Sequence, residues 1–365
     1  MEKTELQKLP EYYGILGWED VAPLFAVSWV SGVPCVFVGD PGSSKSTFQI
    51  RFARSLGLKV EILDLQYLTQ TRLLGIPNPD KLKQGVLNYV GGVIAHKPDV
   101  VILEELTRCF DHVQGLILEF LREGRIDNQY LKCKRIANCN PPQNDLIGIH
   151  YLDYAAATRL VHISIPNISN ELMKTFINNW NREWEPDSKG IALAQKLDTL
   201  TIQSPPTDQF KEIANSIMTV LAEYRLSGRQ LDTLMRLLSA SWNIEQTGLH
   251  TFSALDLGRM AASTIPLQLT KNRWNIDSEM LAIQVSRHLS DFPWSQRFEK
   301  KTQVASMKVE EAKQKFNTLS IKELAEISLK SDLDGFIAFE TMLHKISTSA
   351  EFRIPFDNFE ELLAK

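Results

Sequence analysis

The stretch VPCVFVGDPGSSKST, residues 33–47, decides how the rest of the chain is organised. Residues 33–38 form a mostly apolar run, which predicts a short buried strand. Gly39 ends that run, GDPGSSKS follows as a glycine-containing loop, and a helical pattern then covers about residues 47–56. A strand, a glycine-containing loop and a helix that opens with Lys-Ser form the context in which a loop binds phosphate.

The predicted loop offers several kinds of phosphate ligand. Its successive backbone N–H groups point inward, and the following helix adds a partial positive charge at its N-terminus. Lys45 is expected to reach the β- and γ-phosphates of ATP, and the Ser46 hydroxyl is expected to hold Mg²⁺. A turn with a chance Lys-Ser pair is the alternative, which the flanking strand and helix disfavour. The predicted binding residues are Gly39, Asp40, Pro41, Gly42, Ser43, Ser44, Lys45, Ser46 and Thr47.

The composition narrows the class of protein. A chain of 365 residues with ordinary apolar and charged fractions can form two or three soluble domains. The net charge of −4 argues against a strongly basic chain that binds nucleic acid. No apolar run reaches the roughly 18 residues of a membrane span, and the first residues lack the apolar core of a secretory signal.

The cysteines point to a reducing compartment. They are four in number and too scattered for a disulfide framework: Cys35, Cys109, Cys133 and Cys139. Cys133 and Cys139 lack the close Cys or His pairs of a structural zinc site. We therefore expect reduced cysteines in a cytoplasmic protein that contacts no membrane.

Up to about residue 166, apolar runs alternate with helical patterns. Strands are predicted at residues 33–38, 60–65, 100–103, 135–137 and 160–165, and helices at 17–29, 47–56, 112–123 and 153–158. The segment between residues 66 and 92 is rich in turn residues and is expected to project as a loop or short hairpin between two short helices. The alternation predicts an α/β fold with a parallel sheet, whose ligands bind at the carboxyl ends of the strands.

Beyond residue 167 the strand signals fade. Helical patterns recur at residues 170–182, 189–200, 207–226, 229–243 and 253–263, and again at 279–289 and 309–346. We therefore predict three parts: a nucleotide-binding domain at residues 1–166, an all-helical lid domain at 167–271 and a helical C-terminal extension at 272–365. The extension carries no recognisable chemistry.

Two carboxylates and an amide follow predicted strands. Glu104 and Glu105 end the strand at residues 100–103, downstream of the phosphate-binding loop. In that position one carboxylate is expected to serve the Mg²⁺ side, here Glu104, and the next to act as general base, here Glu105. Asn140 ends a neighbouring strand and is expected to orient the attacking water. Two exposed acids and an ordinary Asn-Pro turn are the alternatives.

Two arginines and two aromatic residues complete the candidates. Arg159 precedes the last predicted strand, and Arg229 opens a helix of the second domain. Either arginine can stabilise charge on a γ-phosphate, although a single surface arginine is more often an ion-pair partner. Tyr13 and Trp18 are considered as stacking partners of the adenine base, although an aromatic residue here more often belongs to the core.

The order and spacing of these pieces resemble the AAA+ ATPases, and more closely the MoxR family. GDPGSSKS resembles the Walker A motif, and VVILEELTR resembles the Walker B block. IANCNP is similar to the sensor 1 strand, with Asn140 as the sensor. LDYAAATRLVHISIP is similar to the arginine-finger segment, which implies Arg159, and LSGRQL to the start of the sensor 2 helix, which implies Arg229. The resemblance covers roughly residues 16–269.

The resemblance implies an ATP-hydrolysing ring, with a hexamer expected and a nucleotide at each subunit interface. Arg159 would then act on the ATP of the neighbouring subunit. The segment around Gly75 is similar in place to the family's insertion, which faces the centre of the ring. Such proteins resemble remodelling chaperones and often work beside a partner with a von Willebrand factor A domain.

Three positions depart from the family pattern. Glu104 replaces the usual aspartate and is longer by one methylene, about 1.5 Å. Ser44 replaces the general glycine, and Thr107 stands where an asparagine precedes Arg108. Two alternatives to a protein-remodelling motor therefore stay open. One is a nucleotide-gated scaffold with little turnover, and the other is a nucleic-acid motor, which the acidic charge balance disfavours.

Overall fold

The computed structural model describes residues 3–109, 111–126, 129–142, 151–152, 154–167, 187–203, 207–270 and 277–290, with single positions at 169, 172, 174, 175 and 185. The chain divides into two compact units, Met1–Asp291 and Phe292–Lys365, and every described residue lies in the first. Most of the helix predicted at residues 170–182, and all of the one at 309–346, lies outside the described residues.

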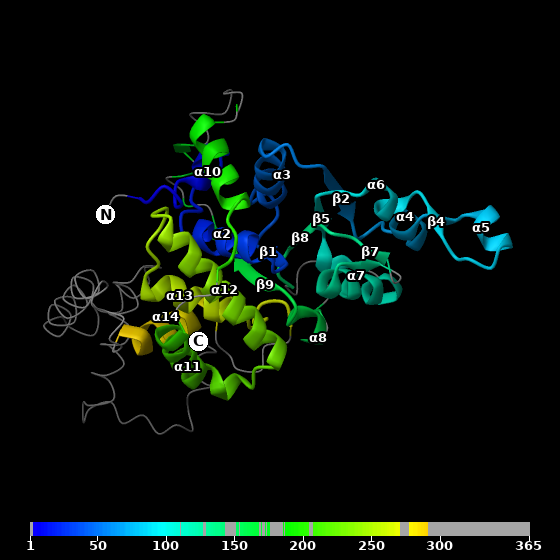
Figure 1. Ribbon diagram of the computed structural model, residues 1–365. Helices are drawn as coiled ribbons and strands as arrows, with labels where there is room; N and C mark the ends of the chain where they lie inside the picture. Colours follow the sequence, from blue (N-terminus) through cyan, green and yellow to red (C-terminus); the bar gives the residue numbers. More distant parts are fainter. Residues whose placement is uncertain are drawn as a thin grey trace, which may run out of the picture. The chain divides into compact units, whose positions relative to one another are not determined.

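Five parallel strands form the central sheet (Figure 1). In chain order they are β1 (Cys35–Val38), β2 (Val60–Asp64), β5 (Val100–Glu104), β8 (Lys134–Cys139) and β9 (Val161–Ser164). Their order across the sheet is β2-β5-β8-β1-β9, so the strand before the glycine-containing loop lies between β8 and β9. The predicted α/β fold with a parallel sheet is confirmed.

The strand register brings three strand ends to one edge of the sheet. Val38 at the end of β1 pairs with Cys139 at the end of β8. Leu103 near the end of β5 pairs with Ala137 of β8. Since the residues that follow β1, β5 and β8 leave the sheet on this edge, their polar side chains gather there, as the rule for parallel sheets requires.

Helix α2 (Val21–Ser31) is more deeply buried than its sequence pattern predicts. All of its residues are buried, whereas the pattern predicts one buried face. The reason is that α2 packs against β9 and also against α10 (Ser188–Asp198), α12 (Gly228–Gln246) and α13 (Ala254–Ser263). The helix therefore joins the sheet to the helical part of the chain.

Aromatic side chains fill the space between α2, β1 and α3 (Lys45–Ser55). Phe25 lies edge to face with Phe48, with ring centroids 5.0 Å apart. Tyr13 and Trp18 are 1% and 2% exposed and also contact Phe48. Both residues therefore belong to this core cluster, and neither is among the residues that line the cavity described below.

The segment between β2 and β5 forms a projecting hairpin, called the arm here and defined as residues 75–92 (Figure 1). Its strands β3 (Ile76–Pro77) and β4 (Tyr89–Val90) pair antiparallel, and the short helix α5 (Pro79–Lys83) lies between them. Helices α4 (Gln70–Leu74) and α6 (Gly92–His96) flank the arm, as predicted. Five large apolar residues of the arm are more than half exposed: Ile76, Leu82, Val86, Leu87 and Val90.

Glycines allow the two backbone segments at the base of the arm to touch. Gly75 has φ 93°, and a Cβ there would lie 2.5 Å from the carbonyl oxygens of Val90 and Gly91. A Cβ on Gly92, with φ 71°, would lie 2.5 Å from the Gly75 nitrogen. Only residues without a Cβ fit both the close approach and the left-handed backbone.

Shorter elements complete the sheet-bearing part. They are α1 (Leu9–Tyr12), the 3₁₀ helix η1 (Leu106–Arg108), α7 (Asp111–Glu123), the hairpin β6 (Arg125–Ile126) and β7 (Gln129–Tyr130), and α8 (Tyr154–Ala157). The sequence pattern did not predict α1 or the hairpin, because neither is long enough to show a periodicity.

The helical part comprises α10, α11 (Thr207–Leu221), η2 (Ala222–Tyr224), α12, α13 and α14 (Ser278–Ser290). Helix α14 packs on α13 and α11, so the helical packing continues to Ser290. At the α13–α14 crossing, a Cβ on Gly258 would lie 2.2 Å from the carbonyl oxygen of Ala282. In the described part of the chain, no helix has the length and apolar character needed to cross a membrane.

Candidate nucleotide site

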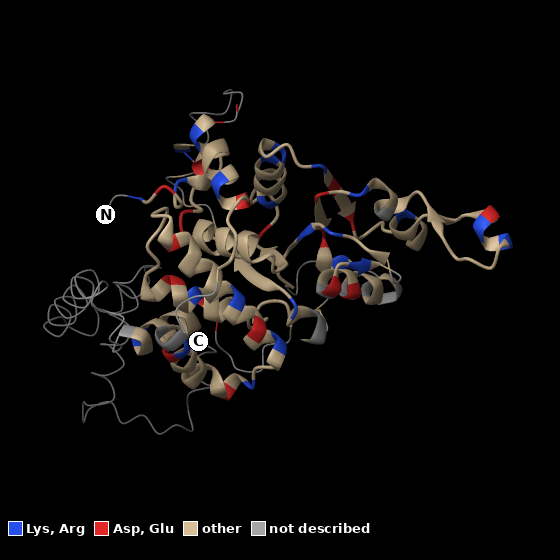
Figure 2. Cartoon of the chain, in the orientation of Figure 1, with Lys and Arg blue, Asp and Glu red and all other residues tan. Residues whose placement is uncertain are grey.

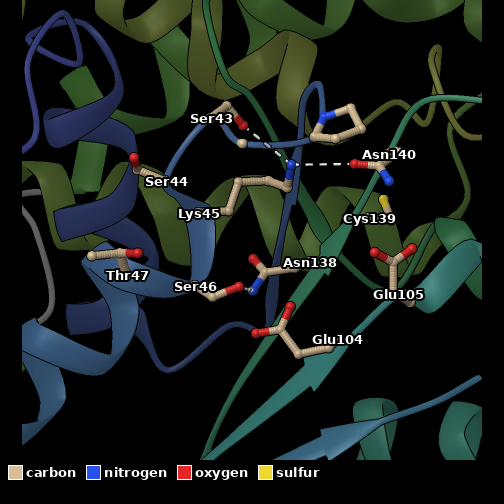
Figure 3. Close-up of a pocket in the computed structure, with 12 residues that line it drawn as sticks. Ser43, Ser44, Lys45, Ser46, Thr47, Glu104, Glu105, Asn138, Cys139 and Asn140 are labelled. Carbon is tan, nitrogen blue, oxygen red and sulfur yellow. Dashed lines mark hydrogen bonds between the residues drawn. The ribbon is translucent and has the colours of Figure 1, made fainter. Parts of the chain in front are cut away.

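A cavity of about 320 Å³ lies over the carboxyl ends of β1, β5 and β8 (Figure 3). The residues that line it are Pro41, Gly42, Ser43, Ser44, Lys45, Ser46, Thr47, Glu104, Glu105, Asn138, Cys139 and Asn140. Three groups predicted from separate parts of the sequence thus meet in one place: the glycine-containing loop, the two carboxylates and Asn140. Gly39 and Asp40 contribute through their backbone.

The Lys45 ammonium is held by oxygen atoms of its own loop. Its Nζ donates to the carbonyl oxygens of Gly39 and Asp40 at 2.7 and 2.8 Å, and to Ser43 Oγ at 3.1 Å. It also donates to Asn140 Oδ1 at 3.3 Å. These acceptors hold the cation at the cavity wall, where phosphate oxygens would exchange with them.

Burial lowers the pKa of the Lys45 ammonium, because the cavity wall removes water from the charge. The negative charges of the Glu105, Glu104 and Asp40 side chains oppose that shift. Burial also raises the pKa of the Cys139 thiol, so this thiol is neutral at pH 7. Lys45 therefore faces the two carboxylates as the charged partner in the cavity wall.

Ser44 has a backbone conformation that favours glycine. Its φ is 68° and its ψ is 18°, in the left-handed region, immediately before α3 begins at Lys45. Residues with a Cβ adopt this region at a cost of roughly 1–2 kcal/mol. The structure thus explains why glycine is the general residue here and shows that serine fits the same turn.

A pair of buried amides lies behind Ser46. Asn138 Nδ2 donates to Ser46 Oγ at 3.3 Å and to Gln49 Oε1 at 3.0 Å. In return, Gln49 Nε2 donates to Asn138 Oδ1 at 2.5 Å. Asn138 and Gln49 are 1% and 0% exposed. The Ser46 hydroxyl is therefore tied to β8 through a pair of amides that hold each other.

The two carboxylates leave β5 in different directions. Glu104 is the last residue of the strand and lies on the side of Ser46 in Figure 3. Glu105 has a left-handed backbone, with φ 57° and ψ 46°, and precedes η1. Its Oε2 lies 3.2 Å from Nε of Arg108, one turn further along the chain. The left-handed backbone at Glu105 thus lets two consecutive acids line the same cavity.

Asn140 is fixed from both sides. Its Oδ1 accepts from Lys45, and its backbone oxygen accepts from Thr107 Oγ1 at 3.3 Å. Thr107 is the residue that departs from the usual asparagine, and here it joins η1 to the end of β8. The Asn140 amide nitrogen is then the end of this side chain that can bind a water or a phosphate oxygen.

Arg159 and Arg229 are not among the residues that line this cavity. Arg159 is half-buried between α8 and β9. Arg229 is exposed in the first turn of α12, where Ser227 and Gln230 form a capping box. Their predicted roles toward the γ-phosphate stay predictions.

The donor set fits Mg²⁺. The Ser46 hydroxyl and the Glu104 carboxylate are hard oxygen ligands, and Mg²⁺ in nucleotide sites uses one or two such protein ligands beside phosphates and water. Within the described residues, no group of three or more His, Cys, Asp or Glu side chains is placed to enclose a metal ion. The chain therefore offers a partial site of the kind that a nucleotide completes.

A second cavity, of about 350 Å³, lies beside β9, the strand that pairs with β1. It lies between the start of α2, the end of β9, α13 and the start of α14. Ile165 belongs to its wall and packs on Gly39, where an added Cβ would lie 2.7 Å from Ile165 Cβ. Arg259 closes one side by pairing with Asp20 at 3.2 Å and Glu279 at 2.8 Å.

Asn138, Gln49 and Cys139 are the site residues that sequence reasoning missed. A signal for Asn138 was present, since side chains two apart on a strand share a face and Asn138 lies two residues before Asn140. No local pattern linked Gln49 to Asn138, because their contact joins α3 to β8.

Comparisons with known proteins agree with this geometry. Residues 34–150 match the AAA domain family, dynein-related subfamily. No curated protein matches the chain. The structure is similar to the crystal structure of a proposed ATPase from Cytophaga hutchinsonii, with a TM-score of 0.53 and 17% identity over 78% of this chain and 94% of that chain.

The described residues therefore have the AAA+ P-loop fold, with a helical part after the sheet. The match to the AAA domain family supports an ATP-hydrolysing enzyme in general terms.

Proposed function

We propose that the protein hydrolyses ATP in the cavity over β1, β5 and β8. The observation that carries this proposal is the position of Lys45, whose half-buried ammonium is held by the loop and lines the same cavity as Glu104 and Glu105. Loop N–H groups and the N-terminus of α3 would bind the phosphates, and Lys45 would exchange its loop carbonyls for phosphate oxygens.

In the proposed reaction the chain supplies a base, an orienting amide and a binding site for a cation. Glu105 accepts the proton of the attacking water, and the Asn140 amide orients that water or a phosphate oxygen. Ser46 and Glu104 hold Mg²⁺, which neutralises charge on the phosphates when it is bound. The second cavity would take the nucleoside, because its wall at Ile165 contacts the loop at Gly39.

Steady-state ATP hydrolysis with Mg²⁺ tests the proposal, with Glu105→Gln as the comparison. We expect the wild-type protein to turn over ATP, and the variant to bind ATP with unchanged affinity but to hydrolyse it at least about 100-fold more slowly. Hydrolysis at the wild-type rate by the variant would remove Glu105 from the role of base.

We further infer a MoxR-type ring, with a hexamer as the expected size, that remodels or assembles a protein partner. The exposed apolar residues of the arm support a role in protein contact, because monomeric proteins seldom keep several such residues together in water. A partner with a von Willebrand factor A domain remains part of this proposal. Sedimentation with and without ATP tests the ring, and a monomer under both conditions would rule it out.

In the ring, Arg159 acts on the ATP of the neighbouring subunit and Arg229 acts on the γ-phosphate from the lid. Mixing Arg159→Ala subunits with Glu105→Gln subunits tests the first role. Some interfaces in the mixture then combine an intact Arg159 with an intact Glu105, so partial recovery of hydrolysis is expected. No recovery at any mixing ratio would contradict the assignment.

A nucleotide-gated scaffold with little turnover is the second candidate, and Glu104 is the observation that favours it. The longer side chain replaces the aspartate of the family pattern on the cation side of the site. ATP binding without hydrolysis by both the wild type and Glu105→Gln would favour this candidate. A Glu104→Asp variant that gains hydrolysis would then identify the extra methylene as the cause.

A further inference from the structure

We propose that Asn138 is a positioning residue that orients the Ser46 hydroxyl for cation binding, and that Gln49 holds Asn138 in place. The family pattern and the sequence reasoning assign no role to either amide. Both side chains are almost fully buried: Asn138 on β8 is part of the cavity wall, and Gln49 on α3 contacts it. Because this inference rests on the proposed function, its test separates cation binding from nucleotide binding.

In the structure the Asn138 amide has its nitrogen toward Ser46. Oδ1 accepts from Gln49, and Nδ2 donates to both Gln49 Oε1 and Ser46 Oγ. An amide nitrogen has two N–H groups, and these two acceptors use both of them. In this arrangement the pair of amides presents one N–H donor to Ser46 at the cavity wall.

That donor determines which side of the Ser46 oxygen remains available. A hydroxyl oxygen has two lone pairs, and the Asn138 N–H occupies one of them. The other lone pair is left for a cation, and the hydroxyl proton must point to an acceptor other than Asn138. A serine hydroxyl rotates among three staggered positions, so a fixed neighbour reduces the cost of ordering it.

A threonine at the same position would need this support less. Its branched Cβ restricts rotation about χ1 and so leaves its hydroxyl fewer positions even without a partner. Removal of the Asn138 amide should therefore raise the Mg²⁺ concentration needed for half-saturation when residue 46 is serine. The increase should be smaller in a Ser46→Thr background. A purely structural amide pair would cost the same in both backgrounds.

The experiment measures binding of a fluorescent, non-hydrolysable ATP analogue by the full chain, first in EDTA and then across a Mg²⁺ titration. The main variant is Gln49→Leu with Asn138→Leu, because removing both partners together leaves no buried amide unpaired and preserves folding best. Asn138→Leu is then made alone, in the Ser46 and the Ser46→Thr backgrounds. Asn243→Leu, which removes a buried amide of α12, is the control.

We expect the double variant to bind the analogue in EDTA within about twofold of wild type but to need about 3- to 10-fold more Mg²⁺ for half-saturation. The loss should shrink in the Ser46→Thr background, and the control should leave the Mg²⁺ dependence unchanged. An unchanged Mg²⁺ half-saturation, or an equal loss in EDTA, would overturn the inference while leaving the proposed function intact. Wild-type protein that fails to bind the analogue would overturn both.

Discussion

The Glu105 carboxylate lies 3.2 Å from the Arg108 guanidinium, across the single turn of η1. This contact holds the side chain of the proposed base, whose own backbone is left-handed with φ 57°. Arg108 also donates to Gln66 Oε1 at 3.4 Å, two residues after β2. The direction of the Glu105 side chain thus depends on contacts that reach the end of β2, which is the third strand from β1 in the sheet.

Arg108→Ala should slow ATP hydrolysis about tenfold, because a misplaced base loses much of its effect. ATP binding should stay unchanged, since Arg108 does not line the cavity. Single-turnover hydrolysis and analogue binding measure the two quantities. Arg125→Ala is the control, because that arginine pairs only weakly with Glu123, at 3.9 Å on the surface. Equal hydrolysis by both variants would show that Arg108 does not position the base.

Ser44→Gly should retain ATP binding and raise the free energy of unfolding by up to about 1 kcal/mol. The left-handed backbone at φ 68° penalises a Cβ, and the greater entropy of glycine in the unfolded chain offsets part of the gain. Ser44→Val should lower stability, because a branched Cβ fits this region worst. Thermal unfolding of the three proteins gives the order, and a valine variant as stable as the glycine variant would contradict the explanation.

Gly258→Ala should destabilise the helical part by about 2 kcal/mol or more. The added Cβ would overlap the Ala282 backbone, which cannot move without separating α13 from α14. Gly228→Ala at the start of α12 is the matched control, because nothing lies within 4 Å of its Cβ position. Helix propensity favours alanine at both positions, but only the Gly258 position has a clash. Gly228→Ala should therefore raise the free energy of unfolding, and Gly258→Ala should lower it. Denaturant unfolding measures this, and a neutral Gly258→Ala would show that the crossing is loose.

His162 should make stability fall in acid. Burial lowers its pKa to about 4, and the hydrogen bond between Nε2 and the Ala157 oxygen, at 2.7 Å, only partly opposes this. Between the ordinary value of 6.5 and about 4, the unfolded chain binds a proton at this position and the folded chain does not. The stability difference is therefore absent above pH 6.5 and grows to about 3 kcal/mol as the pH falls through 4.

His162→Gln tests that dependence, because glutamine can donate to the same carbonyl oxygen but does not titrate. Its unfolding free energy should fall less steeply than that of wild type between pH 6.5 and 4. Other acidic and basic groups contribute to both proteins and cancel in the difference. Parallel curves for the two proteins would mean that His162 titrates normally.

The parallel sheet and most of the residues that line the first cavity could be predicted from the sequence, because their signals are local. Continuous apolar runs marked the strands, and the residues after them marked the carboxyl edge. The full burial of α2 could not be predicted, since it depends on helices more than 150 residues away in the chain. The left-handed Glu105 also carried no signal, because glutamate seldom adopts that conformation.

The amide pair of Gln49 and Asn138 also could not be predicted from local sequence patterns. Each residue is ordinary in its own element, and only the packing of α3 on the sheet brings the two amides together. The aromatic pair Tyr13 and Trp18 suited two roles in the sequence, and their burial in the cluster around Phe48 decides for the core.

The close contact between Gly75 and Gly92 closes the base of the arm independently of the residues at its tip. The two backbone segments touch at Gly75 and Gly92, so the residues between them can change in number or type without moving β2 and β5. Closing a longer loop on such a fixed base costs little, about 0.6 kcal/mol for each doubling of its length. The tip of the arm could therefore change in length and sequence while the candidate site stays as it is, so a contact made by the tip would be free to diverge independently of that site.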